Sequence, residues 1–273
     1  MAAVREVVAR ALAEDLLPLG DLTAALVDPA ASARAAVVSR AEGVVAGRLC
    51  AGEAFAQVDG GVELTWRIDD GDRVGAGTVL AHVVGPLTPV LTAERTALNL
   101  LSHLSGVATL TSRYVAAVAG TATRVLDTRK TTPGLRALEK AAVRAGGGHN
   151  HRGNLSEMVL VKDNHRAGAS IAEAVARARQ RWPLRAVEVE CDSAEHVRQA
   201  LAAGATALLL DNMGPDQVRD CVAEVDGRAT VEVSGGLTLD TVAAFAAAGA
   251  DFVSVGALTH SAPALDIGLD LDA

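Results

Sequence analysis

Cationic and imidazole side chains gather in one stretch of the sequence, between Asp127 and His165. The stretch contains the motifs TRKTTPGLR, GGGHNHR and LVKDNH, and its arginines, lysines and histidines outnumber its carboxylates. The whole chain carries a formal net charge of −8, so this concentration of positive charge runs against the composition. A local positive field inside an acidic protein indicates a focused site for a small, highly negative ligand.

The composition argues against larger partners. Nucleic-acid binding favours a broad basic face with stacking aromatic residues, and aromatic residues make up only 2% of this chain. No apolar run approaches the ~18 residues of a membrane span, and residues 1–16 have the pattern of a charged amphipathic helix. We therefore expect no nucleic-acid partner and no membrane. Three cysteines, Cys50, Cys191 and Cys221, lack paired spacing, which predicts reduced thiols in a cytoplasmic protein.

The first part of the chain predicts a small mixed domain. Helical periodicity covers residues 4–17, and short β-type runs separated by glycine turns follow between residues 35 and 85. A long helical pattern then covers residues 89–119, with Thr92 as its expected N-cap and Arg95 in its first turn.

After Gly120 the sequence alternates between short apolar runs and alanine-rich helical patterns. The expected strands are 125–128, 158–161, 186–190, 207–210, 230–233 and 252–255. The expected helices are 135–145, 170–181, 193–203, 215–225 and 238–248. Such alternation is typical of an α/β fold with a parallel sheet, and right-handed crossovers can curl the sheet towards a barrel. We expect an open six-stranded parallel α/β barrel.

Residues able to do chemistry stand at the ends of these strands. In chain order they are Arg129-Lys130, Lys162, Glu190, Asp211, Ser234-Gly235-Gly236 and Gly256-Ala257. In a barrel all of these positions converge on the C-terminal rim, where active sites are built. The sequence therefore predicts one site that contains cations, carboxylates and glycine turns together.

Each group of residues suits one part of a phosphorylated ligand. The glycine turns could hold a phosphate through backbone N–H groups, and the arginines could grip carboxylates or phosphates bidentately. Glu190 and Asp211 suit Mg²⁺, which binds through one or two carboxylates and substrate oxygens. His149, His151 and His165 could in principle ligate zinc, but the charges of the nearby Arg152 and Lys162 oppose a dication. We expect these histidines to hydrogen-bond an anionic substrate instead.

The motifs, in their order and spacing, closely resemble the quinolinate phosphoribosyltransferase family. The resemblance rests on GDLT, ERTALNLLSHLSGVAT, DTRKTTPGLR, GGGHNHR, LVKDNH, VEVE, LLLDNM, SGGL and VSVGALTHSAPALDIGLD, and it covers nearly the whole chain. It implies transfer of a phosphoribosyl group from phosphoribosyl pyrophosphate to quinolinate, with release of pyrophosphate and CO₂ and with Mg²⁺ as cofactor. It also implies an N-terminal α/β sandwich domain (residues 1–106), a barrel domain (residues 107–273), and a homodimer with shared active sites.

The resemblance also implies roles for individual residues. Quinolinate would meet Arg129, His151, Arg152 and Lys162, with Arg95 contributed by the neighbouring subunit. The expected catalytic residues are Lys130, Lys162, Glu190 and Asp211, of which the two carboxylates are also the expected Mg²⁺ ligands. The remaining expected substrate contacts are Thr128, Ser234, Gly235, Gly236, Val255, Gly256 and Ala257. Lys130 and His151 are candidates to protonate the ring carbon after decarboxylation.

Two other functions are compatible with parts of this pattern. A paralogue associated with molybdenum transport shares much of the motif set and would act on a different acid. A non-catalytic sensor of a phosphorylated metabolite is the other alternative, although a sensor has no need for both Mg²⁺ carboxylates. Intact TRKTTPG and GGGHNHR motifs favour the quinolinate enzyme.

Overall fold

The computed structural model describes residues 1–166 and 168–272. Contacts divide the chain into two compact units. The first unit consists of Met1–Ser112, Thr131–Gly147 and the residues from Leu258 onward, and the second consists of Arg113–Lys130 and Gly148–Ala257. The chain therefore leaves the first unit and returns to it twice.

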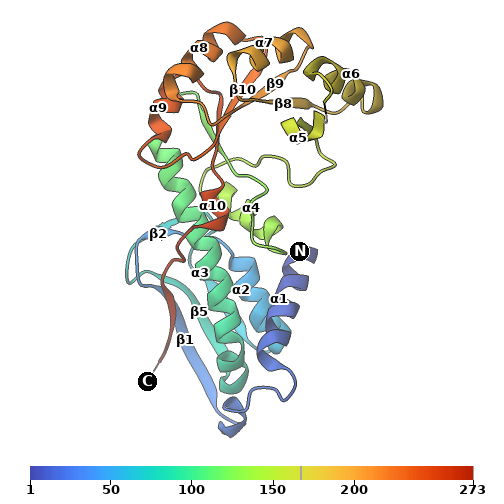
Figure 1. Ribbon diagram of the computed structural model, residues 1–273. Coiled ribbons are helices and arrows are strands. Elements are labelled where there is room, and N and C mark those ends of the chain that lie inside the picture. Colours follow the sequence, from blue (N-terminus) through green and yellow to red (C-terminus); the bar gives the residue numbers. More distant parts are fainter. Residues whose placement is uncertain (167, 273) are drawn as a thin grey trace. The chain divides into compact units, whose positions relative to one another are not determined.

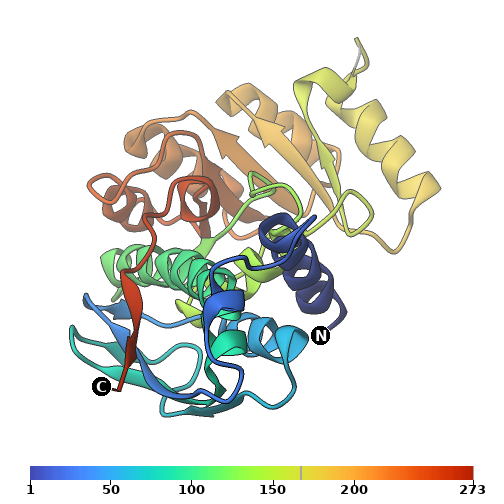
Figure 2. The same ribbon diagram turned by 90° about the horizontal axis from the view of Figure 1, so that it is seen from below.

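The first unit is built on an antiparallel sheet of order β12-β1-β5-β3. Its strands are β1 (Ser32–Ser39), β3 (Glu63–Trp66), β5 (Val79–Pro86) and β12 (Ile267–Leu271). The strand β12, near the end of the chain, lies beside β1, and Figure 2 shows the two side by side. A short pair, β2 (Gly43–Val44) and β4 (Arg73–Val74), stands apart from this sheet. The unit also holds the helices α1 (Ala2–Leu16), α2 (Arg48–Val58) and α4 (Arg136–Ala145), together with a short 3-10 turn over Ala24–Leu26.

Two local expectations for this region were wrong. The helix α2 occupies a stretch where we expected only strands and turns, and it buries Cys50, Ala54 and Phe55. The long helix α3 (Leu87–Ala117) begins before Thr92, so Thr92 is an internal residue and not the N-cap. Its hydroxyl donates instead to Asp21, 3.1 Å away, and Asp21 also accepts the backbone N–H groups of Thr23 and Ala24.

The second unit confirms the expected six-stranded parallel sheet. Its order is β6-β11-β10-β9-β8-β7, and every neighbouring pair is parallel. The strands are β6 (Arg124–Leu126), β7 (Val159–Val161), β8 (Val187–Cys191), β9 (Ala207–Asp211), β10 (Thr230–Ser234) and β11 (Phe252–Ser254). The first and last strands of this order, β6 and β7, are not hydrogen-bonded to each other, so the sheet is open.

Helices between the strands cover one face of this sheet (Figure 1). They are α6 (Ile171–Arg181), α7 (Ala194–Ala202), α8 (Pro215–Val225) and α9 (Val242–Ala247), with a short turn of helix at α5 (Asp163–Arg166). The short helix α10 (Ala257–His260) follows β11, and from Leu258 onward it belongs to the first unit. Residues at the helix N-terminus determine where two of these helices begin. Ser170 and Glu173 form a reciprocal capping box at α6, and Pro215 occupies the first turn of α8.

The core of the second unit is made of small aliphatic side chains. Val189, Leu208, Leu210 and Val233 are fully buried in the middle of their strands. Within the described part of the chain, no helix combines the length and the apolar character needed to cross a bilayer.

Candidate active site

The face of the parallel sheet opposite helices α6–α9 carries two layers of side chains, most of them polar. Successive residues of a strand point to opposite faces, so positions two apart share a face. Lys162, Glu190, Asp211 and Ser234 form the layer at the strand ends, and Leu160, Glu188, Leu209, Glu232 and Ser254 form the layer beneath it. All of these residues except Glu188 line one pocket of about 270 Å³, together with Thr128, Arg129, Lys130, His151 and Arg152.

The upper layer pairs a lysine with a carboxylate. The ammonium group of Lys162 hydrogen-bonds Oε2 of Glu190 on the neighbouring strand. Asp211 lies close enough to Glu190 for the two charges to interact. Burial, followed by the charge of Glu190, raises the pKa of Asp211 above its ordinary value, while Lys162 and Lys130 oppose that rise. The upper layer is therefore rich in charge of both signs.

The lower layer contains two buried glutamates that we did not include among the expected site residues. Glu188 is 2% exposed and Glu232 is 5% exposed. Nε2 of His151 lies 3.2 Å from Glu188 and 3.4 Å from Glu232, and the Ser254 hydroxyl donates to the other oxygen of Glu232. The sequence did contain a signal for Glu188, because the alternation in VEVE places it on the same face as Glu190.

The histidine reaches this position because Asp127 holds its loop. Asp127 is fully buried at the end of β6, and its carboxylate accepts the backbone N–H of His151 at 2.9 Å and the side-chain amide of Asn150. His149 adds a parallel bridge to Leu126, so the HNHR segment continues the sheet beyond β6. Backbone and side-chain bonds together fix the HNHR segment to this strand.

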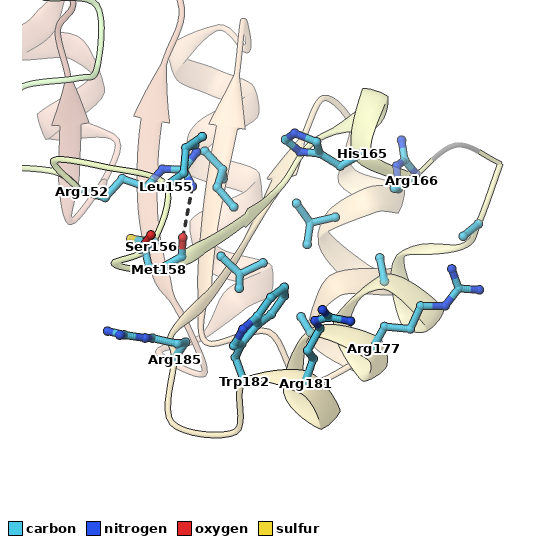
Figure 3. Close-up of a pocket in the computed structure, with 16 residues that line it drawn as sticks. Arg152, Leu155, Ser156, Met158, His165, Arg166, Arg177, Arg181, Trp182 and Arg185 are labelled. Carbon is cyan, nitrogen blue, oxygen red and sulfur yellow. Dashed lines mark hydrogen bonds between the residues drawn. The ribbon is translucent and has the colours of Figure 1, made fainter.

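The arginines of the pocket repel one another. Arg129 and Arg152 both line this pocket, and burial, followed by the like charge of Arg129, lowers the pKa of Arg152. The Arg152 guanidinium donates to the Met158 carbonyl at 3.1 Å, as drawn in Figure 3. Like charges held close together in a partly buried pocket indicate a site for a multiply charged anion.

The structure brings together nine of the expected site residues. Those lining the pocket are Thr128, Arg129, Lys130, His151, Arg152, Lys162, Glu190, Asp211 and Ser234. Gly235, Gly236, Val255, Gly256 and Ala257 follow the ends of β10 and β11 without lining the pocket. Arg95 belongs to the first unit, where it lines a separate hollow of about 260 Å³ with Asp21 and Thr92.

A larger pocket of about 660 Å³ lies along β7 and α6. Leu155, Met158 and Trp182 contribute to its apolar surface, while Arg177 and Arg181 project from α6 (Figure 3). Trp182 is 48% exposed and Leu155 is 68% exposed, although both are large hydrophobic residues. Arg152 lines this pocket as well as the smaller one, so the two are adjacent.

Family models match both parts of the chain. The C-terminal domain of quinolinate phosphoribosyl transferase matches residues 107–270, and the N-terminal domain matches residues 21–105. The chain belongs to this family. It is 44% identical to nicotinate-nucleotide pyrophosphorylase [carboxylating] of Mycobacterium leprae, over 98% of this chain and 97% of that protein. It is 42% identical to the probable enzyme of the same name from Bacillus subtilis, over 92% of this chain and 88% of that protein.

Solved structures of family members have the same fold. The nicotinate-nucleotide pyrophosphorylase of Francisella tularensis superposes with a TM-score of 0.95 at 37% identity, covering 99% of this chain and 96% of that one. The protein of the same name from Ehrlichia chaffeensis gives a TM-score of 0.94 at 36% identity and covers 98% of both chains. The expected α/β fold and the expected family are therefore confirmed.

Proposed function

We propose that this chain transfers the phosphoribosyl group of phosphoribosyl pyrophosphate to quinolinate, with loss of CO₂, to give nicotinate mononucleotide in NAD synthesis. One observation carries the proposal: Arg129, Arg152 and Lys162 converge in the same pocket as the carboxylates Glu190 and Asp211. Cations suit a dicarboxylic acid, and carboxylates suit the ribose hydroxyls and a metal-bound pyrophosphate. A site that bound only one of these substrates would not need both the cations and the carboxylates.

The residues act mainly by binding and orientation. The ring nitrogen of quinolinate attacks C1 of the ribose, and the C1–oxygen bond to pyrophosphate breaks with its electron pair leaving on oxygen. Arg129, Arg152 and Lys162 hold the two carboxylates so that the ring nitrogen faces C1, and Lys130 stabilises the departing pyrophosphate. The carboxylate beside the ring nitrogen then leaves as CO₂, and the ring carbon takes up one proton.

The phosphate end of the substrate has its own candidate contacts. Thr128 and Ser234 line the pocket, while Gly235, Gly236, Val255, Gly256 and Ala257 follow the ends of neighbouring strands. Gly235 and Gly236 have φ angles of +102° and +61°, so their turn departs from the conformations of ordinary residues. We assign the 5′-phosphate to this edge, where backbone N–H groups can bind its oxygens.

Magnesium fits the carboxylates of the upper layer. Glu190 and Asp211 would hold Mg²⁺ through hard carboxylate oxygens, and water and pyrophosphate oxygens would complete the coordination that Mg²⁺ prefers. Bound Mg²⁺ would neutralise charge on the pyrophosphate. Lys162 must then share Glu190 with the metal, because the ammonium group hydrogen-bonds this carboxylate in the structure.

We further propose a homodimer in which Arg95 of the partner subunit completes each pocket. Arg95 has a side chain that is 64% exposed, and Glu94 at 3.8 Å is its ion-pair neighbour. The chain also exposes apolar surface that a second copy can bury. Leu17, Leu19 and Leu26 are between 72% and 86% exposed, and the pocket along β7 and α6 is largely apolar.

A direct assay tests the proposed function. The protein is incubated with quinolinate, phosphoribosyl pyrophosphate and Mg²⁺, and nicotinate mononucleotide and CO₂ are measured together. We expect both products in equal amounts, and little product when nicotinate replaces quinolinate, because one carboxylate fewer leaves a partly buried cation without its substrate partner. Comparable turnover of nicotinate would contradict the assignment of Arg129, Arg152 and Lys162.

The alternatives give different results in the same assay. A paralogue acting on another acid would release no nicotinate mononucleotide, and a sensor would bind without turnover. No finding from the family comparison favours the molybdenum-transport paralogue.

We place the enzyme in the cytoplasm, and the free thiols Cys50, Cys191 and Cys221 support this placement.

A further inference from the structure

Both ring nitrogens of His151 already have partners within the protein. Nδ1 accepts the backbone N–H of Arg152 at 2.8 Å, and Nε2 faces Glu188 and Glu232. A histidine that binds a substrate carboxylate must present a ring N–H to it. In this arrangement both ring nitrogens face groups of the protein, although the ring lines the pocket.

The proton on the ring can be assigned from the same contacts. Burial lowers the pKa of His151, but Glu188 and Glu232 outweigh that effect and raise it to about 9. A second ring proton would have to sit on Nδ1, where it would meet the Arg152 N–H across 2.8 Å. Two N–H groups cannot point at each other across this gap. We therefore give the amide contact more weight and assign a neutral ring with its proton on Nε2.

We propose that Glu188 and Glu232 are positioning residues for the reaction. They hold His151 with its proton on Nε2, which leaves Nδ1 bare to fix the Arg152 amide and so directs the Arg152 guanidinium into the cationic pocket. Ser254 supports the arrangement by donating to Glu232, and the Met158 carbonyl anchors the guanidinium. The kinetic part of this inference rests on the proposed function, because it uses quinolinate as the substrate.

A metal ion is the other explanation for this cluster. Ligand atoms of His151, Glu188 and Glu232 lie within 4.8 Å of one another, as a metal site requires. The hydrogen bonds from Ser254 and from the ring to the two carboxylates already satisfy this group, and Arg152 and Arg129 lie nearby. Positive neighbours oppose a cation and favour a hydrogen-bonded cluster.

Nitrogen-15 NMR of histidine-labelled protein tests the assignment without any substrate. The His151 signals are identified by their loss in His151→Asn. At neutral pH we expect Nε2 to be protonated and Nδ1 to be bare. In Glu188→Gln and Glu232→Gln, the new amide can donate to Nε2, so we expect the ring proton to move partly to Nδ1. A doubly protonated ring in the wild type, or an unchanged tautomer in both variants, would overturn the proposal.

Kinetics supply the second measurement. For Glu188→Gln and Glu232→Gln we expect KM for quinolinate to rise roughly tenfold, while KM for phosphoribosyl pyrophosphate stays within about twofold. Ser254→Ala, which loosens Glu232 without removing it, should shift KM for quinolinate in the same direction by about threefold. Asp251→Asn is the matched control, because Asp251 accepts the N–H of Val231 at the opposite end of the sheet. Its two KM values should stay at wild-type levels.

The outcomes separate this inference from the proposed function. If KM rises equally for both substrates in the glutamate variants, these residues only support the fold. A wild-type protein with no activity on quinolinate would defeat the proposed function, while the NMR result would still decide the His151 assignment. If a single glutamate variant does not fold, Ser254→Ala and the other glutamate variant keep the test intact.

Discussion

The buried carboxylate of Asp127 accepts the backbone N–H of His151 at 2.9 Å. This contact joins the end of strand β6 to the HNHR segment, which is 24 residues away along the chain. It places Arg152 in the pocket with Arg129, although helix α4 lies between them in the sequence.

Asp127→Asn tests this link. The asparagine amide can place an N–H group opposite the backbone N–H of His151, which needs an acceptor. The variant should therefore lose about 2–3 kcal/mol of unfolding free energy. Its kcat/KM for quinolinate should fall roughly tenfold or more as the segment loosens. Urea unfolding and steady-state kinetics measure the two effects. Asp216→Asn, a change at a fully exposed helix start, should alter neither quantity and serves as the control.

Asp211→Asn tests the magnesium assignment. If Asp211 acts through Mg²⁺, the variant should bind phosphoribosyl pyrophosphate roughly tenfold more weakly in the presence of Mg²⁺. Chelating the metal should weaken wild-type binding but change little in the variant, because the ligand is already missing. Calorimetry with quinolinate alone should give the wild-type affinity. Equal loss for both substrates would assign Asp211 a structural role.

Gly235→Ala tests the turn after β10. A methyl group there would lie 2.4 Å from the side-chain oxygen of Asn212 and 2.8 Å from its backbone nitrogen, at a φ of +102°. Gly236→Ala is the control: it has a φ of +61° and no atom within 4 Å of the added methyl. We expect about 1 kcal/mol of destabilisation at Gly236, from the left-handed conformation alone, and about 2–3 kcal/mol more at Gly235. Similar losses in the two variants would show that Asn212 can move away.

The thiols should resist alkylation in the folded protein. Burial raises the pKa of Cys50 to about 11 and that of Cys191 to about 12, and it also raises the pKa of Cys221. A raised thiol pKa leaves less of the reactive thiolate at any given pH, by roughly tenfold per unit. At pH 8 we expect mass spectrometry to find unmodified cysteines in native protein and full alkylation in denaturant. Fast labelling of the native protein would contradict the burial of these side chains.

Mixed dimers test whether Arg95 acts in trans. Arg95→Ala and Lys162→Ala subunits, each inactive as a homodimer, are dissociated, mixed in equal amounts and reassembled. If Arg95 of the partner subunit completes the pocket, each mixed dimer has one intact site, and roughly a quarter of wild-type activity should return. If Arg95 serves its own chain, every site in the mixture lacks either Arg95 or Lys162, and no activity returns. No recovery, with mixed dimers demonstrated by mass, would reject the shared site.

The sequence alone determined the upper layer of the pocket. Lys162, Glu190, Asp211 and Ser234 stand at or just beyond the ends of apolar runs, and parallel strands bring such positions to one edge whatever the details of packing. The N-terminal cap of α6 is also encoded locally, because Ser170 and Glu173 interact within one turn of helix. Family membership followed from the same short motifs.

Only the tertiary structure decided which residues lie beneath that edge. Glu188 and Glu232 are ordinary strand residues in the sequence, and their importance appears only when the register sets them beside His151. The pairing of β12 with β1 likewise joins segments from opposite ends of the chain, which no local pattern encodes. Contacts between distant residues depend on sheet register and on burial, and these are properties of the whole fold.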